Sequence, residues 1–249
     1  MWLFIWYIFT IFIAFIMAWS VHVLLKQRSA WKAFSEKKKL TYEKGRTLLA
    51  SPAVHGKLGE FDFNLFSEQQ PSPDGRLPRF YTVIEIGTPF PAPAYTVMGT
   101  SGKAALMEEL PLQKVPGPAR EGWDESWILY TSDAAITEKV LTSGRVDCLK
   151  KIFGMNISAG MFAFDGSRAV LRLETVDPMQ DSEKLERIVS GLIQQAEILR
   201  VSGEEHTMFT AMAKAASVAG PAQETSENAA PSVTEEDTRS TDENIDTEK

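Results

Sequence analysis

A segment rich in Gly and Lys at residues 99–103, Gly99-Thr100-Ser101-Gly102-Lys103, has the composition of a phosphate-binding loop. The Walker pattern requires a glycine where Val97 stands and a Ser or Thr where Ala104 stands. Because both residues depart from the pattern, we interpret the segment as a turn that precedes a helix.

Cys148 is the only cysteine of the chain, so no intramolecular disulfide can form. Lys150 and Lys151 follow closely, and their positive charge could lower the pKa of the thiol. We favour a buried structural thiol over a reactive one. A lone thiol also suits a reducing compartment.

The remaining candidates for chemistry form no specific constellation. His55 and His206 are isolated in the sequence, and Glu204-Glu205-His206 is a lone cluster without the spacing of a zinc site. Ser101, His55 and an Asp could be combined into a triad, but the many Ser and Asp residues give that combination no specificity. The sequence therefore predicts no metal and no cofactor, leaves any catalytic residues unknown, and favours a protein that is not an enzyme.

Residues 1–25 form an apolar run without Asp, Glu, Lys or Arg. As a helix the run is about 37 Å long, enough to cross the ~30 Å hydrocarbon core of a bilayer. A cleaved signal peptide would need a basic start, a shorter apolar core and a small-residue cleavage site. Ala18-Trp19-Ser20 comes nearest to such a site but lies inside the run. We therefore predict an uncleaved transmembrane helix.

His22 lies within this run, where an ionisable side chain is a candidate functional group. Ala18 stands four residues before it, which resembles the pigment-ligating pattern of bacterial light-harvesting polypeptides. That resemblance implies pigment or haem ligation as a remote alternative function. Because Lys26 follows four residues later, we favour a position of His22 at the headgroups without a special role.

The segment after the apolar run is basic, with eight Lys or Arg against two Glu in residues 26–46, whereas no basic side chain precedes the run. The positive-inside rule then places the N-terminus outside and the soluble domain in the cytoplasm of a single-pass protein of the cell inner membrane. We expect anionic headgroups to contact this neck. The expected membrane-surface contacts are Lys26, Arg28, Trp31, Lys32, Lys37, Lys38 and Lys39. The alternative for the last three lysines is a solvated helix face.

The chain divides into four predicted parts: a transmembrane helix at 1–25, a basic juxtamembrane helix or neck at 26–50, a soluble α+β domain at 51–203, and a mostly disordered acidic tail at 204–249. Ser51-Pro52 is expected to end the neck. Residues 221–249 carry nine Asp or Glu against two basic residues and few large apolar side chains, which is typical of disorder. We favour a solubilising tail over an acidic interaction arm. The net charge of -7 argues against nucleic-acid binding.

Strand and helix signals alternate within the domain and indicate an α+β fold of antiparallel strands with two or three helices. An Asp165-Gly166 turn between apolar runs predicts a hairpin over residues 161–173. Asp133 is a candidate helix cap. Strands are expected at 57–66, 80–86, 95–98 and 127–130, helices at 133–150 and 181–200, and loops at 67–79 and 111–122.

Three features of the chain carry a resemblance: the N-terminal span, the glycines of Gly56-Lys57-Leu58-Gly59, and the helix–hairpin–helix order from Thr131 to Arg200. In these features the chain resembles uncharacterised bacterial single-pass membrane-anchored proteins with an α+β soluble domain. The resemblance implies this architecture and transfers no activity. We expect a membrane-tethered interaction, scaffold or accessory protein with a protein partner. The alternative is a membrane-anchored enzyme with an unrecognised site in the α+β domain.

Overall fold

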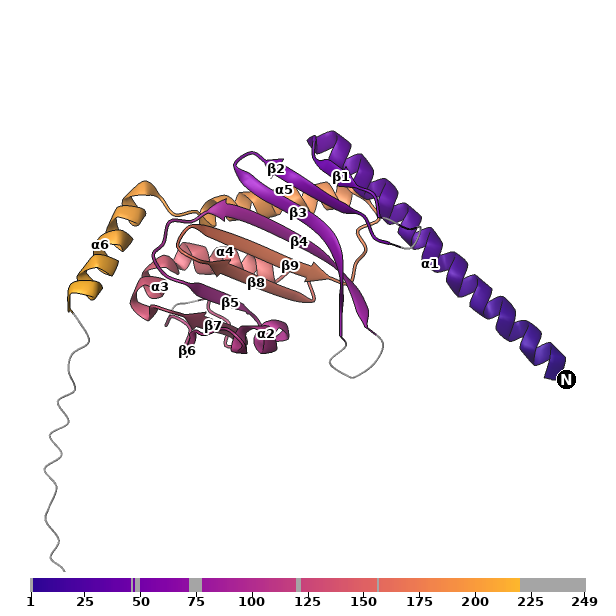
Figure 1. The fold of residues 1–249 in the computed structure, drawn as a ribbon, viewed down its shortest axis with the longest axis horizontal. Helices are drawn as coiled ribbons and strands as arrows, with labels where there is room; N and C mark the ends of the chain where they lie inside the picture. Colours follow the sequence, from indigo (N-terminus) through magenta and orange to yellow (C-terminus); the bar gives the residue numbers. More distant parts are fainter. Residues whose placement is uncertain are drawn as a thin grey trace, which may run out of the picture.

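A computed structural model describes residues 2–45, 47, 50–71, 78–119, 122–155 and 157–219. Within these residues, one antiparallel sheet of nine strands has the order β1-β2-β3-β4-β9-β8-β5-β7-β6 (Figure 1). The strands are β1 (Thr41–Glu43), β2 (Ala53–Leu58), β3 (Phe61–Gln70), β4 (Arg79–Pro89), β5 (Thr96–Thr100), β6 (Gln113–Val115), β7 (Trp127–Thr131), β8 (Ala159–Phe164) and β9 (Arg168–Thr175).

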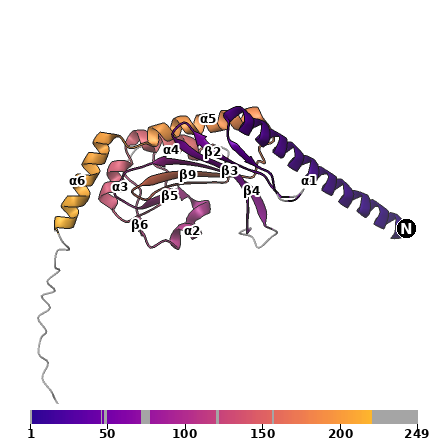
Figure 2. The ribbon, with the colours of Figure 1, turned by 45° about the horizontal axis from the view of Figure 1, so that its top comes forward.

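Helices cover one face of this sheet. The C-terminal part of α1 (Trp2–Lys38), α4 (Ser143–Phe153) and α5 (Ser182–Leu199) lie over it, as Figure 2 shows. Leu185, Val189 and Leu192 of α5 are buried there, which confirms the amphipathic helix predicted at 181–200. The remaining helices are the short α2 (Ala104–Glu108), α3 (Ala134–Val140) and α6 (Gly203–Ala219), with a 3-10 turn η1 (Ser101–Lys103) before α2. The α+β prediction is therefore confirmed.

Strands β2 and β3 correct the prediction of a single strand at 57–66. Gly59 lies between them at φ 66°, a left-handed conformation that glycine adopts without strain, so the chain reverses there. After the turn, Phe61, Phe63 and Leu65 are buried and the residues between them are exposed. This alternation is the period-two pattern of a half-buried strand.

Helix caps explain why the predicted helix at 133–150 is two helices. The Asp133 carboxylate accepts a hydrogen bond from the Ile136 backbone N–H, which confirms the predicted cap of α3. The Thr142 hydroxyl then accepts from the Arg145 N–H and begins α4. Because Thr is a good N-cap but a neutral helix interior residue, the sequence signal for this second start is weak.

The predicted hairpin at 161–173 is confirmed. β8 and β9 pair in register from Ala159–Glu174 to Phe164–Ala169, and Gly166 occupies the turn at φ 86°. The Asp165 carboxylate accepts hydrogen bonds from the backbone N–H groups of Ser167 and Arg168. The Asp165 side chain thus stabilises the turn by bonding to the backbone, which is the reason that Asp-Gly sequences favour turns.

Helix α6 corrects the predicted start of the disordered tail at residue 204. Phe209 of this helix is fully buried, and so it belongs to the main hydrophobic core. The predicted disorder of residues 220–249 lies outside the described residues. The folded domain therefore extends well beyond residue 203.

Candidate functional site

The N-terminal part of α1 is exposed along its whole length. Residues Trp2 to His22 are all exposed, and the most apolar stretch of the helix has none of its residues buried in the domain. These residues rise about 30 Å along the helix axis, which matches the thickness of a hydrocarbon core. This is the one described helix that is long and apolar enough to span a membrane, and its most apolar part is not buried in the domain.

The same helix continues without a break into the core of the domain. Trp31 is 0% and Phe34 1% exposed, and the Phe34 ring lies 5.8 Å from the Phe63 ring of β3. The Arg28 guanidinium donates hydrogen bonds of 2.6 Å to the backbone carbonyls of Thr47 and Ala50. The Arg28 side chain therefore bonds to the domain's own backbone, and Trp31 is buried in the core. These positions correct their predicted contact with the membrane surface.

Helix α1 ends earlier than the predicted neck at 26–50. Lys39 adopts a left-handed conformation at φ 57°, and the Leu40 N–H donates to the Ser35 carbonyl at 2.8 Å. This is the bonding of a Schellman cap, in which a glycine is more usual. Strand β1 follows at once, and so residues 41–43 are extended instead of helical.

Two of the expected membrane contacts, Lys37 and Lys38, form ion pairs with α5. The Lys37 and Lys38 ammonium groups lie 2.6 and 2.8 Å from the two carboxylate oxygens of Glu186. A straight helix also places Lys38 about 20 Å beyond Leu25. Lipid contact of the five lysines stays a prediction; Lys26, Lys32, Lys37 and Lys39 are exposed, and Lys38 is half-buried.

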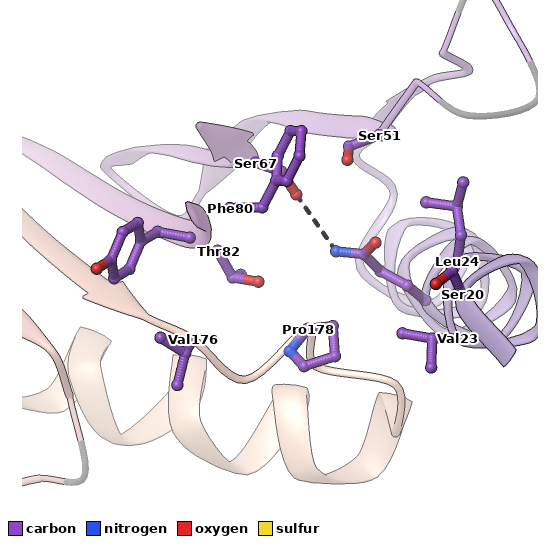
Figure 3. A pocket seen from close by; sticks show the side chains of 11 residues that line it. Ser20, Val23, Leu24, Ser51, Ser67, Phe80, Thr82, Val176 and Pro178 are labelled. Carbon is purple, nitrogen blue, oxygen red and sulfur yellow. Dashed lines mark hydrogen bonds between the residues drawn. The ribbon is translucent and has the colours of Figure 1, made fainter. Parts of the chain in front are cut away.

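A pocket of about 440 Å³ lies where α1 leaves the domain (Figure 3). The Gln27 amide of α1 donates a 3.3 Å hydrogen bond to the Ser67 hydroxyl of β3 across this space. Phe80 and Val176 at the pocket are 63% and 60% exposed. We name this space the junction pocket; its lining residues are Ser20, Val23, Leu24, Gln27, Ser51, Ser67, Phe80, Tyr81, Thr82, Val176 and Pro178.

A second, larger pocket of about 800 Å³ lies on the sheet face opposite α5, and we name it the open-face pocket. Arg172 of β9 lines this pocket and makes most of the charged contacts described here. The Arg172 guanidinium donates to Glu174 and Glu85 at 2.8 Å each and also to Glu68, so it joins three strands. The Lys103 ammonium lies 2.6 Å from Glu174, and both side chains are buried.

The charges in the open-face pocket hold each other in the ionised state. Burial disfavours the charged forms of Glu174 and Arg172, but their hydrogen bonds and opposite charges outweigh it. As a result the pKa of Glu174 lies below its ordinary value and that of Arg172 above. Neither group is near its titration point at neutral pH. The arrangement can therefore bind a charged or polar group, but these two residues are not poised to transfer protons.

The structure brings none of the other sequence candidates together. Residues 99–103 form the predicted turn into a helix, and Lys103 is used in the ion pair with Glu174. Cys148 is buried, and burial raises the pKa of its thiol to about 11, against the smaller opposing effect of the Lys151 charge. This agrees with a structural thiol.

The three histidines lie apart. His22 is exposed on the apolar part of α1, His55 lies 3.8 Å from the Glu43 carboxylate, and the His206 Nδ1 lies 2.8 Å from the Pro91 carbonyl. Among the described residues, no group of three His, Cys, Asp or Glu side chains is placed to hold a metal ion.

Sequence reasoning missed the cluster around Arg172. Two of its members, Glu85 and Arg172, each stand in a strand between apolar neighbours, whereas Glu68 stands between Ser67 and Gln69. That pattern marks a polar sheet face, but it cannot show which strands are neighbours. The pairing of Glu85 with Arg172 across β4 and β9 supplies this information.

Comparisons with known proteins give no family for the chain. No family model matches the sequence, and no curated protein matches it. Among solved structures, the chain is similar to the crystal structure of the mycobacterial trehalose monomycolate transport factor A, TtfA. The sequence identity is 10% and the TM-score 0.43, over 70% of this chain and 94% of that one. A similarity at this level carries no argument about function, which must therefore come from the geometry of this chain.

Proposed function

We propose that this protein is a membrane-tethered interaction or accessory protein whose domain is held rigidly against the bilayer. The observation that carries the proposal is the continuity of α1. One helix joins the exposed apolar residues 2–22 to the buried Trp31 and Phe34. A flexible linker would let the domain diffuse around its anchor, whereas a helix that ends in the core fixes its orientation.

The proposed orientation places the domain in the cytoplasm. Eight basic residues follow the span within residues 26–46, whereas residues 1–25 themselves carry no Lys or Arg. Moving these charges outward would oppose the membrane potential by about 2.3 kcal/mol per charge per 100 mV. Among the exposed basic residues of the neck, Lys26 and Lys32 then lie nearest to the anionic inner leaflet.

The proposed partner surface is the open face of the sheet. Around Arg172 and Lys103 the open-face pocket carries more acidic than basic groups, since Glu68, Glu109 and Glu174 also line it. An excess of carboxylates favours a protein partner that presents a Lys or Arg side chain. For the acidic residues 221–249 a solubilising role is favoured, and contact with the same partner or with the basic neck is the alternative.

The proposal is tested by purification from detergent-solubilised membranes. We expect a co-purifying protein that is retained by the wild-type chain and lost with Glu85→Lys, which reverses a charge on the open face. Glu197→Lys is the matched control, because it makes the same change on α5, away from the open face. A third chain that ends at residue 219 tests the acidic tail.

Retention of the same proteins by Glu85→Lys would exclude the open face as the binding surface. Both charge variants must unfold at the wild-type denaturant concentration within error, since loss of the Glu85–Arg172 ion pair could otherwise act through stability. Recovery of no specific protein from wild-type membranes would contradict the interaction role itself.

A second candidate function is an enzyme whose site is the open-face pocket. The specific observation is its size of about 800 Å³ together with the convergence of Arg172, Lys103 and Glu174. Converging polar groups in a large pocket are the usual mark of a ligand or active site. A metabolite that protects the domain from thermal unfolding in wild type, but not in Arg172→Met, would favour this function.

A further inference from the structure

The junction pocket lies at the level where the proposed span ends. Three of its lining residues, Ser20, Val23 and Leu24, come from α1 at the end of the exposed apolar run. If residues 2–22 occupy the hydrocarbon core, the pocket opens at the boundary between acyl chains and headgroups. A membrane lipid is therefore the molecule nearest to its mouth.

The lining of this pocket is uncharged. Its polar groups are hydroxyls and one amide, among them Gln27, Ser67 and Thr82, and its apolar groups include Phe80 and Val176. Its volume of about 440 Å³ falls within the range of ~300–1,000 Å³ that is typical of small-molecule sites. This surface suits an apolar chain with a neutral polar end, and it offers nothing to a free ion.

The rim of the pocket exposes large apolar side chains. Phe80 and Val176 are both more than half exposed, and they face a space that the apolar end of α1 also lines, as Figure 3 shows. Contact with acyl chains would remove this apolar surface from water. The exposed rim is thus continuous with the exposed span.

A more enclosed apolar cavity of about 290 Å³ lies beside the junction pocket, between the sheet and α5. Val176 and Pro178 line the junction pocket, whereas Thr175, Asp177 and Met179 line the inner cavity. Residues 175–179 are therefore the wall between them. The Lys184 ammonium, 2.5 Å from the Asp177 carboxylate, ties this wall to α5.

We propose that the junction pocket binds one acyl chain of a phospholipid from the leaflet in which α1 ends. The chain lies between α1 and the strands β3 and β4, and its ester group lies near the Gln27 amide and the Ser67 hydroxyl. The proposal rests on the proposed anchoring of α1. It makes the domain a lipid-binding unit in addition to a tethered partner surface.

The test uses the full chain in vesicles of phosphatidylcholine and phosphatidylglycerol that contain a phospholipid with a diazirine on one acyl chain. After irradiation, mass spectrometry locates the covalent adducts. We expect adducts on the span and also on Thr82 inside the pocket, which is only 3% exposed. A lipid that touches only the rim would label Phe80 and Val176 but could not reach Thr82.

Two filling variants sharpen the test. Val176→Trp and Val23→Trp place a large side chain in the pocket from opposite walls, and each should remove the Thr82 adduct while leaving those on the span. Ile198→Trp is the matched control, because Ile198 is 50% exposed on α5 and lines neither pocket. At least one filling variant must keep the wild-type denaturant midpoint.

The outcomes separate this inference from the proposed function. Adducts on the span without Thr82, or a Thr82 adduct that survives both filling variants, would overturn the lipid site and leave the anchor intact. A chain without any adduct on residues 2–22 would overturn the anchor, and the lipid site with it. Loss of the Thr82 adduct in Ile198→Trp would also count against a specific pocket.

Discussion

Arg145 of α4 and Glu205 of α6 form a two-point salt bridge, in which the guanidinium nitrogens lie 2.9 and 2.7 Å from the two carboxylate oxygens. Arg145 is buried and also donates to the carbonyls of Val140 and Arg200. The pair therefore joins the last described helix to the core of the domain. Bidentate pairs of this kind are among the stronger polar contacts in proteins.

The first prediction concerns this pair and pH. Burial raises the pKa of Glu205, but hydrogen bonds from Arg145 and the Ser202 N–H outweigh it, so the pKa lies below its ordinary value. A lowered carboxylate pKa stabilises the fold above the unfolded pKa of ~4.3, and this stability is lost as the pH falls through the folded pKa. We expect Glu205→Gln to lower the free energy of unfolding by about 1–3 kcal/mol at pH 7. The difference should shrink below about pH 4, and denaturant titrations at both pH values measure it. A constant difference would contradict the ionic role.

The second prediction separates α6 from the rest of the tail. Deletion of residues 221–249 should leave the denaturant midpoint nearly unchanged, because that segment carries few large apolar side chains. Deletion of residues 203–249 should lower it clearly, since it removes the buried Phe209 and Glu205. Equal midpoints for the two truncated chains would show that α6 contributes nothing to stability.

The third prediction concerns the end of α1 in the core. Trp31→Ala should lower the free energy of unfolding by about 3–5 kcal/mol, because a fully buried aromatic side chain leaves a cavity. Lys32→Ala is the control, since the neighbouring Lys32 side chain is 63% exposed and its loss should change stability by less than ~0.5 kcal/mol. If Trp31 contacted lipid instead of the core, the two variants would differ little in detergent.

The fourth prediction concerns the thiol. Cys148 is 2% exposed, its Sγ donates to the Gln195 carbonyl at 3.3 Å, and its pKa is raised to about 11 by burial. We expect a thiol reagent at pH 8 to label it only in denaturant, because the native thiol is both protonated and covered. Rapid labelling of the native protein would contradict its buried position.

The fifth prediction concerns orientation. A phosphatase fused after Lys249 should be inactive in a bacterial host, and a fluorescent protein fused there should fluoresce, because the basic neck favours the cytoplasmic side. Reversing the charge of Lys26, Lys32, Lys37 and Lys38 together should weaken this preference. An active phosphatase on the wild-type chain would place the domain outside.

A separate test applies to His22. Substitution by Ala should leave membrane insertion intact and release no pigment or haem, since the match to a pigment-ligating pattern consists of two residues. Absorbance spectra of the purified wild type and variant measure this. A visible absorbance band that disappears in His22→Ala would support the remote ligand role.

The sequence by itself determined the features that depend on neighbours along the chain. Each of these features involves residues that are close together in the sequence. They are the apolar run before Lys26, the Asp165-Gly166 turn, the Asp133 cap and the apolar stripe of α5. Local propensity and periodicity are sufficient for such features, because the interacting groups are close in sequence. The neck prediction extended the helix over Thr41–Glu43, whereas this run is a strand, because its pairing with β2, which begins at Ala53, is not visible in the run itself.

Only the tertiary structure decided which distant residues meet. It placed the basic neck against α5, so Lys37 and Lys38 pair with Glu186, 148 or more residues away along the chain. It also assembled Glu68, Glu85 and Arg172 from three strands, and it closed the junction pocket between α1 and β3. The order of strands in an antiparallel sheet depends on the packing of whole layers, and one-dimensional patterns do not encode it. Both candidate sites lie at such long-range contacts, which is why the sequence predicted the anchor and the elements but not the pockets between them.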